Sequence, residues 1–395
     1  MSAWPKVAVI GGSIGGLTAA LVLRDLGCEV DVFERSSRAL ESRGAGIGMH
    51  PMTVRYFRES ALLDAARVEI ELPWLRFLDV GGATVHEEVM NYRFSSWSTI
   101  YRGLLSCFDT ARYHLGCEVT GIHRDEEGVS IRLAGGAAHR ADLLVCADGI
   151  ASSARAGLLP AAQPRYAGYV AWRATLPEAV LSPDTAAALG SALTYCVLPD
   201  GHVLAYPIPG PEGEIDPGRR LANLVWYHNY AEGPELDTLL TGDDGTRHEL
   251  SIPPGRVGAH HVEWARAFAR EHMAPPIAEI LEKCAQPFVQ VIYDIEIERM
   301  AFGRVCLVGD AAFAVRPHAA AGTAKACADA WGLRDALREA EGDPLEALAA
   351  WEPGQLLLGR TLLERTREMG ERSQFRHDWT PGDPTLRLGL YGPGR

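Results

Sequence analysis

The chain has 395 residues, a formal net charge of −13 at pH 7 and a hydrophobic share of 47%. This size and composition allow one or two domains with a core large enough to enclose a cofactor. Negative charge repels phosphate backbones and anionic lipids, so we expect neither nucleic acid nor a membrane surface as a partner. The sequence also lacks an apolar run of about 18 residues, the length that predicts a membrane-spanning helix.

The eight cysteines are scattered along the chain and form no C-x-x-C pair. This spacing argues against a zinc site or a redox motif, and we expect no metal. Cysteines within apolar runs are typical of small buried side chains in a reducing compartment. The first apolar run, residues 7–10, is too short for a signal peptide and is followed at once by glycines. We therefore expect a cytoplasmic protein.

The start of the chain predicts a strand–turn–helix–strand unit. The apolar run 7–10 ends in a glycine-rich turn at 11–16, a helical pattern follows at 17–26, and residues 29–34 alternate like a second strand. A unit of this kind within about thirty residues is the usual beginning of a dinucleotide-binding domain.

The segments that follow predict two kinds of structure. From about residue 166 to 291 the chain is rich in aromatic residues, prolines and strand-like runs separated by turn signals, which predicts an antiparallel sheet. Before that region, helical patterns occur at 54–63 and 100–108, strand pairs at 74–80 with 84–89 and at 118–122 with 129–133, and a buried strand at 141–147.

The last third of the chain predicts a short buried strand at 305–308, two long helices at 319–339 and 346–369, and an irregular tail rich in proline and glycine. The expected fold is therefore α/β (α+β overall), with C-terminal long helices. A Rossmann-like nucleotide-binding domain would be interleaved with a smaller antiparallel-sheet domain. The predicted boundaries are 1–72, 101–165 and 288–372 for the nucleotide-binding domain, 73–100 and 166–287 for the substrate sheet, and 373–395 for the tail.

The first motif with chemical content is the glycine-rich turn. Gly11 allows a sharp turn from strand to helix, and Gly15 and Gly16 allow the two to pack closely. The N–H groups of the helix N-terminus would then face a cofactor pyrophosphate. Ser13 replaces the middle glycine of the G-x-G-x-x-G pattern and is small enough for a phosphate to approach. Glu34, 18 residues after Gly16, can accept hydrogen bonds from ribose hydroxyls, but this motif does not choose between FAD and NAD.

The second motif favours FAD. Asp310 follows the predicted buried strand 305–308, where a carboxylate can bind the ribityl chain of a flavin. The next helix is expected to begin near Gly322. Its N–H groups around Thr323 and Ala324 can stabilise negative charge on a reduced flavin ring.

These two motifs, together with Cys-Ala-Asp-Gly-Ile-Ala-Ser-Ser-Ala-Arg at 146–155, resemble three motifs of the p-hydroxybenzoate hydroxylase type of flavoprotein aromatic hydroxylases. They occur in the same order, and in that family the segment that contains Asp148 touches both FAD and NAD(P)H. The resemblance implies an FAD-dependent monooxygenase that uses NAD(P)H and O2. A flavin hydroperoxide would hydroxylate a small, electron-rich aromatic or heteroaromatic ring.

Arginines provide further cofactor candidates. Arg43 and Arg102 match arginines that contact FAD in the family, and a guanidinium can pair with a pyrophosphate bidentately. Arg35, directly after Glu34, is a third candidate. Each could instead be a solvated surface arginine. The chain departs from the family at positions near the Asp310 motif, where side-chain contacts to the ring would be lost: Phe313, Ala319 and Ala324.

The segments 168–173, 200–202, 205–210, 231–234 and 316–322 resemble those of hydroxypyridine-hydroxylating members of the family. They fall in the predicted substrate sheet and the predicted flavin loop. The resemblance therefore favours a hydroxypyridine-like or phenol-like substrate.

The hydroxyl group of such a substrate would have to lose a proton. A phenol with a pKa of about 10 costs about 4 kcal/mol to ionise at about pH 7, so a histidine relay would help. His50 is the first candidate, His318 the second and His202 the third. We expect Tyr206 in the substrate wall and the Pro317 carbonyl near the reacting oxygen. Each of these residues could instead serve packing alone.

Three alternatives stay open. An NAD-dependent dehydrogenase would explain the first motif but leave Asp310 without a role. Another FAD-dependent oxidoreductase on the same scaffold, such as an oxidase, an epoxidase or a halogenase-like enzyme, would use all three motifs. A non-catalytic flavin-binding protein is the third. The choice between NADH and NADPH is also open, as is the oligomeric state, for which a homodimer is one expectation.

Overall fold

The computed structural model describes residues 4–40, 45–60 and 68–395. Its first layer is a five-stranded sheet in which every pair of neighbouring strands is parallel. The strands are almost continuously apolar and buried, as expected for a sheet covered on both faces. The sheet order is β17 (Val305–Leu307), β10 (Leu143–Cys146), β1 (Lys6–Ile10), β2 (Glu29–Glu34) and β6 (Tyr113–Leu115).

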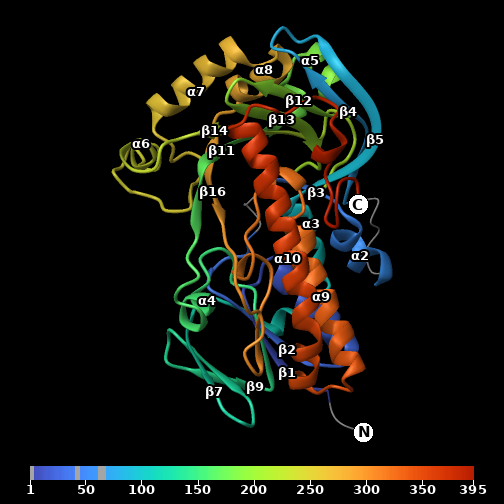
Figure 1. Ribbon diagram of the computed structural model, residues 1–395, viewed down its shortest axis with the longest axis vertical. Helices are drawn as coiled ribbons and strands as arrows, with labels where there is room; N and C mark the ends of the chain where they lie inside the picture. Colours follow the sequence, from blue (N-terminus) through green and yellow to red (C-terminus); the bar gives the residue numbers. More distant parts are fainter. Residues whose placement is uncertain (1–3, 41–44, 61–67) are drawn as a thin grey trace.

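The second layer is a nine-stranded sheet in which only the β12–β4 pair is parallel among its described strands. It occupies the opposite end of the elongated molecule from the parallel sheet (Figure 1). The order is β15 (Ser251–Ile252), β16 (Phe288–Asp294), β11 (Arg165–Pro177), β14 (Leu221–Asn229), β13 (Gly201–Ile208), β12 (Ala192–Leu198), β4 (Ile70–Leu78), β5 (Thr84–Ser96) and β3 (Gly46–Gly48).

The two faces of the large sheet bury different partners. Along β11, Val170, Trp172 and Ala174 belong to a core with helices α7 (Ala259–His272) and α8 (Pro275–Lys283). Because side chains alternate along a strand, the intervening Ala171 and Arg173 point to the opposite face. That face lies toward α10 (Pro344–Gln374) and the loop at 317–322.

The long helix α9 (Gly322–Glu339) packs against both α1 (Ile14–Leu26) and α10 and so joins the two ends of the chain. None of the described helices is both long and apolar enough to cross a membrane. The remaining elements are α2 (Pro51–Glu59), α3 (Trp97–Ser106), α4 (Ser153–Leu158), α5 (Pro183–Leu189), α6 (Pro234–Leu239) and the sheet of β7 (Val119–Arg124), β8 (Val129–Leu133) and β9 (Ala138–Ala141).

The structure confirms the predicted fold class, including the two long C-terminal helices. It differs from the sequence pattern between residues 166 and 291, where only strands and turns were expected. Helices α7 and α8 lie there, and α7 buries only two alanines fully, so its apolar period is weak in the sequence. The domain boundaries stay a prediction, and β3 joins the large sheet from within the segment 1–72.

The segment after α10 has little regular structure, as expected, but it is not a loose tail. Trp379, Leu386, Leu388 and Leu390 are all less than 9% exposed and pack on the large sheet. The Arg365 guanidinium on α10 donates hydrogen bonds to two carbonyl groups of this segment. In Figure 1 the segment runs back beside β4. It therefore forms part of the core.

Truncation of Trp379 tests this role. Trp379→Ala should lower the free energy of unfolding by about 3–5 kcal/mol, because a large buried side chain is removed. Tyr391→Ala is the control, because Tyr391 is 56% exposed. Guanidinium chloride titration of both variants measures the difference. Equal stability of the two variants would show that the segment does not contribute to the core.

Candidate functional site

The glycine-rich turn brings β1, α1 and β10 into very close contact. Gly11 has a φ of +95°, and a Cβ atom there would lie 2.3 Å from the Ala147 carbonyl oxygen. A Cβ at Gly16 would lie 1.9 Å from the Gly11 carbonyl oxygen. Glycine is therefore required at both positions, since any side chain would push the strand and the helix apart. A Cβ at Gly15 would lie 3.1 Å from the Ala326 methyl group of α9.

The N-terminus of α1 is open to a ligand. Ser13 occupies the N-cap position, but its hydroxyl makes no capping hydrogen bond. The first N–H groups of the helix are left available, with the partial positive charge of the helix end. Glu34 lies beside this turn and accepts hydrogen bonds from Gly12 N (2.9 Å) and Ser36 N (2.8 Å). Each carboxylate oxygen keeps a second lone pair, so ribose binding by Glu34 stays a prediction.

Asp310 lies directly after β17, at the same edge of the parallel sheet. Its side chain is accessible, and its carboxylate has no hydrogen-bond donor among the described residues. Burial by surrounding protein atoms raises the pKa of this carboxyl, while the Lys325 and Arg155 cations lower it. Such a carboxylate is free to accept hydrogen bonds from ligand hydroxyls.

A buried ion pair holds the turn that presents Asp310. Lys325 Nζ lies 2.7 Å from Asp329 Oδ2, one helical turn apart on α9, and both side chains are fully buried. Asp329 Oδ2 also accepts a hydrogen bond from Gly309 N at 2.8 Å. This contact ties the turn before Asp310 to the helix that follows it.

The N-terminus of α9 is open as well. Ala321 is the N-cap residue and has no side chain that could cap the helix. The N–H groups of Gly322, Thr323 and Ala324 therefore begin a helix end without a protein cap. The sequence predicted that these residues face the flavin ring, and this stays a prediction.

Asp148 and Arg155 organise the third motif. Asp148 accepts hydrogen bonds from Ser152 Oγ (2.6 Å) and Ala154 N (3.1 Å), which fixes the turn into α4. Arg155 is 3% exposed and donates to the carbonyl groups of Ile150 (2.6 Å) and Ala311 (3.2 Å). Its guanidinium thus joins the motif of Asp148 to the motif of Asp310. The predicted contact of Asp148 with the cofactor is not tested by this geometry.

Together these features fit a flavin nucleotide. Two helix N-termini without side-chain caps suit a pyrophosphate and an anionic ring edge. The free carboxylate of Asp310 suits the hydroxyls of a ribityl chain. All three motifs lie at the carboxyl edge of the parallel sheet, where ligands of such folds bind. No group of side chains suited to a metal ion occurs in the described part of the chain.

The arginine candidates lie in different surroundings. Arg35 is exposed. The Arg102 guanidinium donates to the Pro211 carbonyl and lies 3.9 Å from Glu212, so it contacts the loop after β13. Arg43 lies outside the described residues. Pairing of these arginines with a pyrophosphate stays a prediction.

His50 faces the loop at 317–322. Its Nε2 lies 3.0 Å from the Ala320 carbonyl oxygen. Because a carbonyl only accepts, Nε2 must carry the hydrogen and Nδ1 keeps its lone pair. Burial lowers the pKa of His50, and the Arg365 cation acts in the same direction. His50 is therefore a neutral base at neutral pH, and Ala320 itself has a strained φ of +52°.

The side chains of His318, from this loop, and His202, from β13, lie in a buried cluster of rings. His318 Nε2 is 2.7 Å from the Tyr169 hydroxyl, and its Nδ1 has no described hydrogen-bond partner. His202 Nδ1 is 2.5 Å from Ser373 Oγ, and the two histidine rings are 5.4 Å apart. Burial lowers the pKa of His202 to about 3 and that of His318 well below its ordinary value. Both histidines are neutral, and Trp379 stacks on His202 at 4.5 Å.

Tyr206 lies on the face of the large sheet that is turned toward β3. A Cβ at Gly46 would lie 2.6 Å from the Tyr206 hydroxyl, so the strand passes directly over this ring. Burial raises the pKa of Tyr206 to about 12. Pro317 is half-buried, and its carbonyl accepts a hydrogen bond from Ala320 N at 2.9 Å. Catalytic roles for His50, His318, Tyr206 and Pro317 stay predictions.

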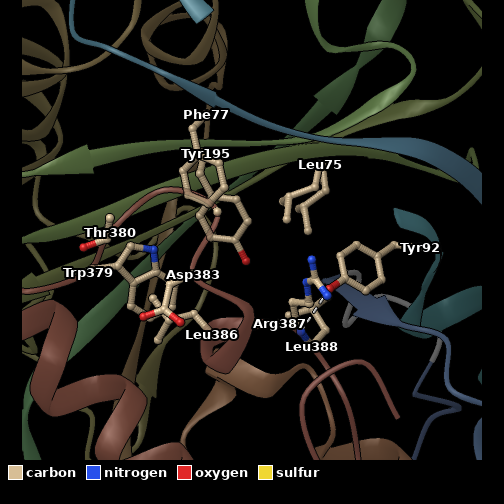
Figure 2. A pocket seen from close by; sticks show the side chains of 12 residues that line it. Leu75, Phe77, Tyr92, Tyr195, Trp379, Thr380, Asp383, Leu386, Arg387 and Leu388 are labelled. Atoms are coloured by element: carbon tan, nitrogen blue, oxygen red, sulfur yellow. Dashed lines mark hydrogen bonds between the residues drawn. The ribbon is translucent and has the colours of Figure 1, made fainter. Parts of the chain in front are cut away.

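A hollow of about 300 Å³, open solvent included, lies between the large sheet and the C-terminal segment. Figure 2 shows Phe77, Tyr195 and Trp379 on one side of it and Tyr92 and Arg387 on the other. The rings of Phe77 and Tyr195 stack at 5.1 Å. The hollow is lined by the same apolar cluster that includes Tyr206 and Ala319, so it extends the sheet face beside the loop at 317–322.

Comparison with known proteins agrees with the class that this geometry defines. Residues 6–61 match the family model "Pyridine nucleotide-disulphide oxidoreductase", and residues 166–294 match "FAD binding domain-like". The fold and the site are those of an FAD-dependent oxidoreductase that uses NAD(P)H.

Similar proteins of known activity identify the family. The chain is 39% identical over 387 residues to 2,6-dihydroxypyridine 3-monooxygenase of Paenarthrobacter nicotinovorans, covering 98% of this chain and 96% of that protein. The solved structure of 2,6-dihydroxypyridine-3-hydroxylase from Arthrobacter nicotinovorans matches with a TM-score of 0.91 and 37% identity, covering 98% and 96% of the two chains. A 6-hydroxynicotinate 3-monooxygenase of Bordetella bronchiseptica is 26% identical, covering 84% and 82%. The chain belongs to the p-hydroxybenzoate hydroxylase type of FAD-dependent aromatic hydroxylases.

Several residues of the site were missed by the sequence analysis. Lys325 and Asp329 stand four residues apart in a helix of small apolar residues, a spacing that indicates an ion pair on one face. Asn223 is a polar residue within the apolar stretch 221–227 of β14, and its burial could have been suspected from that contrast. Arg365 carries no local signal, because its role depends on the path of the C-terminal segment.

Removal of the Asp310 carboxylate tests the cofactor site. Asp310→Ala should weaken FAD binding about 10- to 100-fold, because a hydrogen bond to a charged group contributes about 1.5–3 kcal/mol. Fluorescence titration of the FAD-free protein with FAD measures the change in Kd. Asp200→Ala removes an exposed carboxylate and serves as the control. An unchanged Kd in Asp310→Ala would remove Asp310 from the binding site.

Proposed function

We propose that this enzyme hydroxylates a hydroxypyridine-like ring with NAD(P)H and O2. The observation that carries the proposal is the 39% identity to 2,6-dihydroxypyridine 3-monooxygenase over nearly the whole chain. A hydroxypyridine is also the substrate in the name of the more distant 6-hydroxynicotinate 3-monooxygenase. The matched region includes both the loop at 317–322 and the large sheet, the two elements that would enclose the ring.

Bound FAD supplies the electrons from NAD(P)H and the activation of O2. The chain's own task is to hold the ring and to take up its hydroxyl proton. His50 suits the second task, because its Nδ1 lone pair is free while Nε2 is held by the Ala320 carbonyl. The same contact fixes the imidazole against the loop at 317–322. We therefore assign proton uptake to His50.

The face of the large sheet that carries Tyr206 is suited to holding the ring. Tyr206 and Val225 are buried there, and the C-terminal segment covers the neighbouring part of the sheet. Such a lining excludes water from the ring and from the reacting oxygen. The side chains of His318 and His202 lie in contact with Tyr227, which favours a positioning role over proton uptake for both histidines.

Turnover of a panel of aromatic compounds by the FAD-loaded enzyme tests the proposal. Hydroxypyridines should stimulate NAD(P)H oxidation and give a product heavier by one oxygen atom. Pyridines without a hydroxyl group should do neither. Formation of hydrogen peroxide without oxygenated product would favour an oxidase. If the enzyme hydroxylates phenols but no hydroxypyridine, the assigned substrate class is wrong.

The location of the enzyme is a further part of the proposal. All eight cysteines are free, and most are buried. Free thiols of this kind are typical of a reducing compartment, which supports a cytoplasmic enzyme.

Substitution of His50 tests its assigned role. His50→Ala should slow hydroxylation about 10²- to 10⁴-fold with FAD still bound, because a general base is removed. Burial lowers the pKa of His50, so the wild-type rate should fall only when the pH drops below the ordinary histidine value of about 6.5. The variant should lack this acid limb.

The control for this substitution is His123→Ala, which removes an exposed histidine on β7. Single-turnover kinetics across pH values measure both variants. A wild-type pH profile in His50→Ala would show that another group takes up the proton.

A further inference from the structure

Arg173 is a cation without a carboxylate partner on the inner face of the large sheet. The side chain is half-buried, and its Nε donates a hydrogen bond to Gln290 Oε1 at 2.9 Å. No described carboxylate lies within ion-pair distance of its guanidinium. A partly buried positive charge without a partner is costly, so its retention points to a ligand.

Two fully buried arginines, Arg316 and Arg220, are paired with carboxylates. Arg316 lies 3.1 Å from both Asp294 and Glu371. Arg220 lies 2.6 Å from Glu178. In both pairs a carboxylate balances the buried guanidinium, whereas Arg173 has only the neutral Gln290 amide.

Asn223 adds a second, independent observation. Its side chain is 1% exposed, and its Oδ1 accepts a hydrogen bond from Gly46 N at 3.1 Å. This contact sets the orientation of the amide, because a backbone N–H needs an acceptor. The Nδ2 group is left buried without a described hydrogen-bond partner of good geometry. An unsatisfied buried donor of this kind is uncommon, and an acceptor from a ligand would satisfy it.

The strand register places these donors on one face. Asn223 pairs directly with Tyr206 on β13 and with Thr175 on β11, and Thr175 Oγ1 is also buried without a described partner. Arg173 lies two residues before Thr175, so it points to the same side of the sheet. Side chains in such cross-strand and diagonal positions lie about 5–8 Å apart.

The Tyr206 hydroxyl confirms that these groups converge. Burial raises the pKa of Tyr206 to about 12, while the Arg173 cation and the Asn223 amide both act to lower it. A Cβ at Gly46 would lie 2.6 Å from the Tyr206 hydroxyl and 2.8 Å from Asn223 Nδ2, so these two groups lie side by side. Burial raises the pKa of Tyr227 on the same face, and the Arg173 cation partly opposes this shift. The set offers one positive charge and several hydrogen-bond donors, with no acidic side chain among its members.

We propose that Arg173, Asn223 and Tyr206 form a subsite for a negatively charged oxygen of the aromatic substrate. The inference rests on the proposed function and deepens it: the ring is bound as its anion, with one ionised oxygen held by the Arg173 guanidinium and the Asn223 amide. Recognition of the anion selects rings with an acidic hydroxyl group over neutral rings of the same shape.

Equilibrium binding to the FAD-loaded enzyme tests the subsite. The probes are 2,6-dihydroxypyridine, the non-reacting anion benzoate, and the neutral 2,6-dimethoxypyridine, each followed by the change in flavin absorbance. Arg173→Met should weaken binding of both ionisable probes by tenfold or more and leave the neutral probe unchanged. Arg173→Lys should retain much of the affinity, because the charge is kept. Asn223→Ala should weaken the ionisable probes severalfold.

Arg165→Met is the matched control, because Arg165 is an exposed arginine on the same strand. If Arg173→Met does not load FAD, Arg173→Gln replaces it. Unchanged binding of the ionisable probes in the Arg173 variants would overturn the subsite. If the wild type hydroxylates no hydroxypyridine, the proposed function is wrong. The subsite is then tested by benzoate binding alone. Weaker binding of benzoate to Arg173→Met than to the wild type supports the subsite, and equal binding overturns it.

Discussion

The buried contact between Asp329, Lys325 and the backbone of Gly309 is the constraint on which the site depends. Asp329 Oδ2 accepts hydrogen bonds from both the Lys325 ammonium and the Gly309 N–H, so it links the turn after β17 to α9. Burial alone raises the pKa of Asp329, and the Lys325 cation offsets this by favouring the charged form. Loss of one partner would leave an uncompensated charge in the core, at a cost of about 3–5 kcal/mol. The same helix packs on α1, so this contact also sets the distance between the two open helix N-termini.

The parallel sheet then brings distant segments to one edge. Gly11, Asp148 and Asp310 follow β1, β10 and β17, which are neighbours in the sheet although they are far apart in the chain. Gly11 rests against the Ala147 carbonyl, and Arg155 joins the second and third motifs. The large sheet closes the other side, because β3 and the loop at 317–322 meet through His50 and Ala320. An FAD-dependent hydroxylase needs this arrangement: a nucleotide held along one sheet edge and a ring enclosed against a second sheet.

Much of this could be predicted from sequence because the signals are local. The glycine spacing of residues 11–16, the aspartate after a buried strand and the periodicity of α9 and α10 each reflect a constraint within a few residues. The missed features depend on tertiary contacts. The packing of Trp379 on His202 has no signature in neighbouring residues, and the contrast around Asn223 indicates that it is buried but not that its Nδ2 group lacks a hydrogen-bond partner. Helix α7 was missed because its buried face consists of alanines, which give little contrast in hydrophobicity.

The central claim is that Asp310 and the open N-terminus of α1 hold the same flavin nucleotide. A crystal structure of the purified, FAD-loaded enzyme tests it most directly. The account predicts a pyrophosphate oxygen within hydrogen-bonding distance, about 3 Å, of the N–H groups at Gly15 or Gly16, and a ribityl hydroxyl at a similar distance from the Asp310 carboxylate. A flavin bound elsewhere, or with its ribityl chain away from Asp310, would contradict the account.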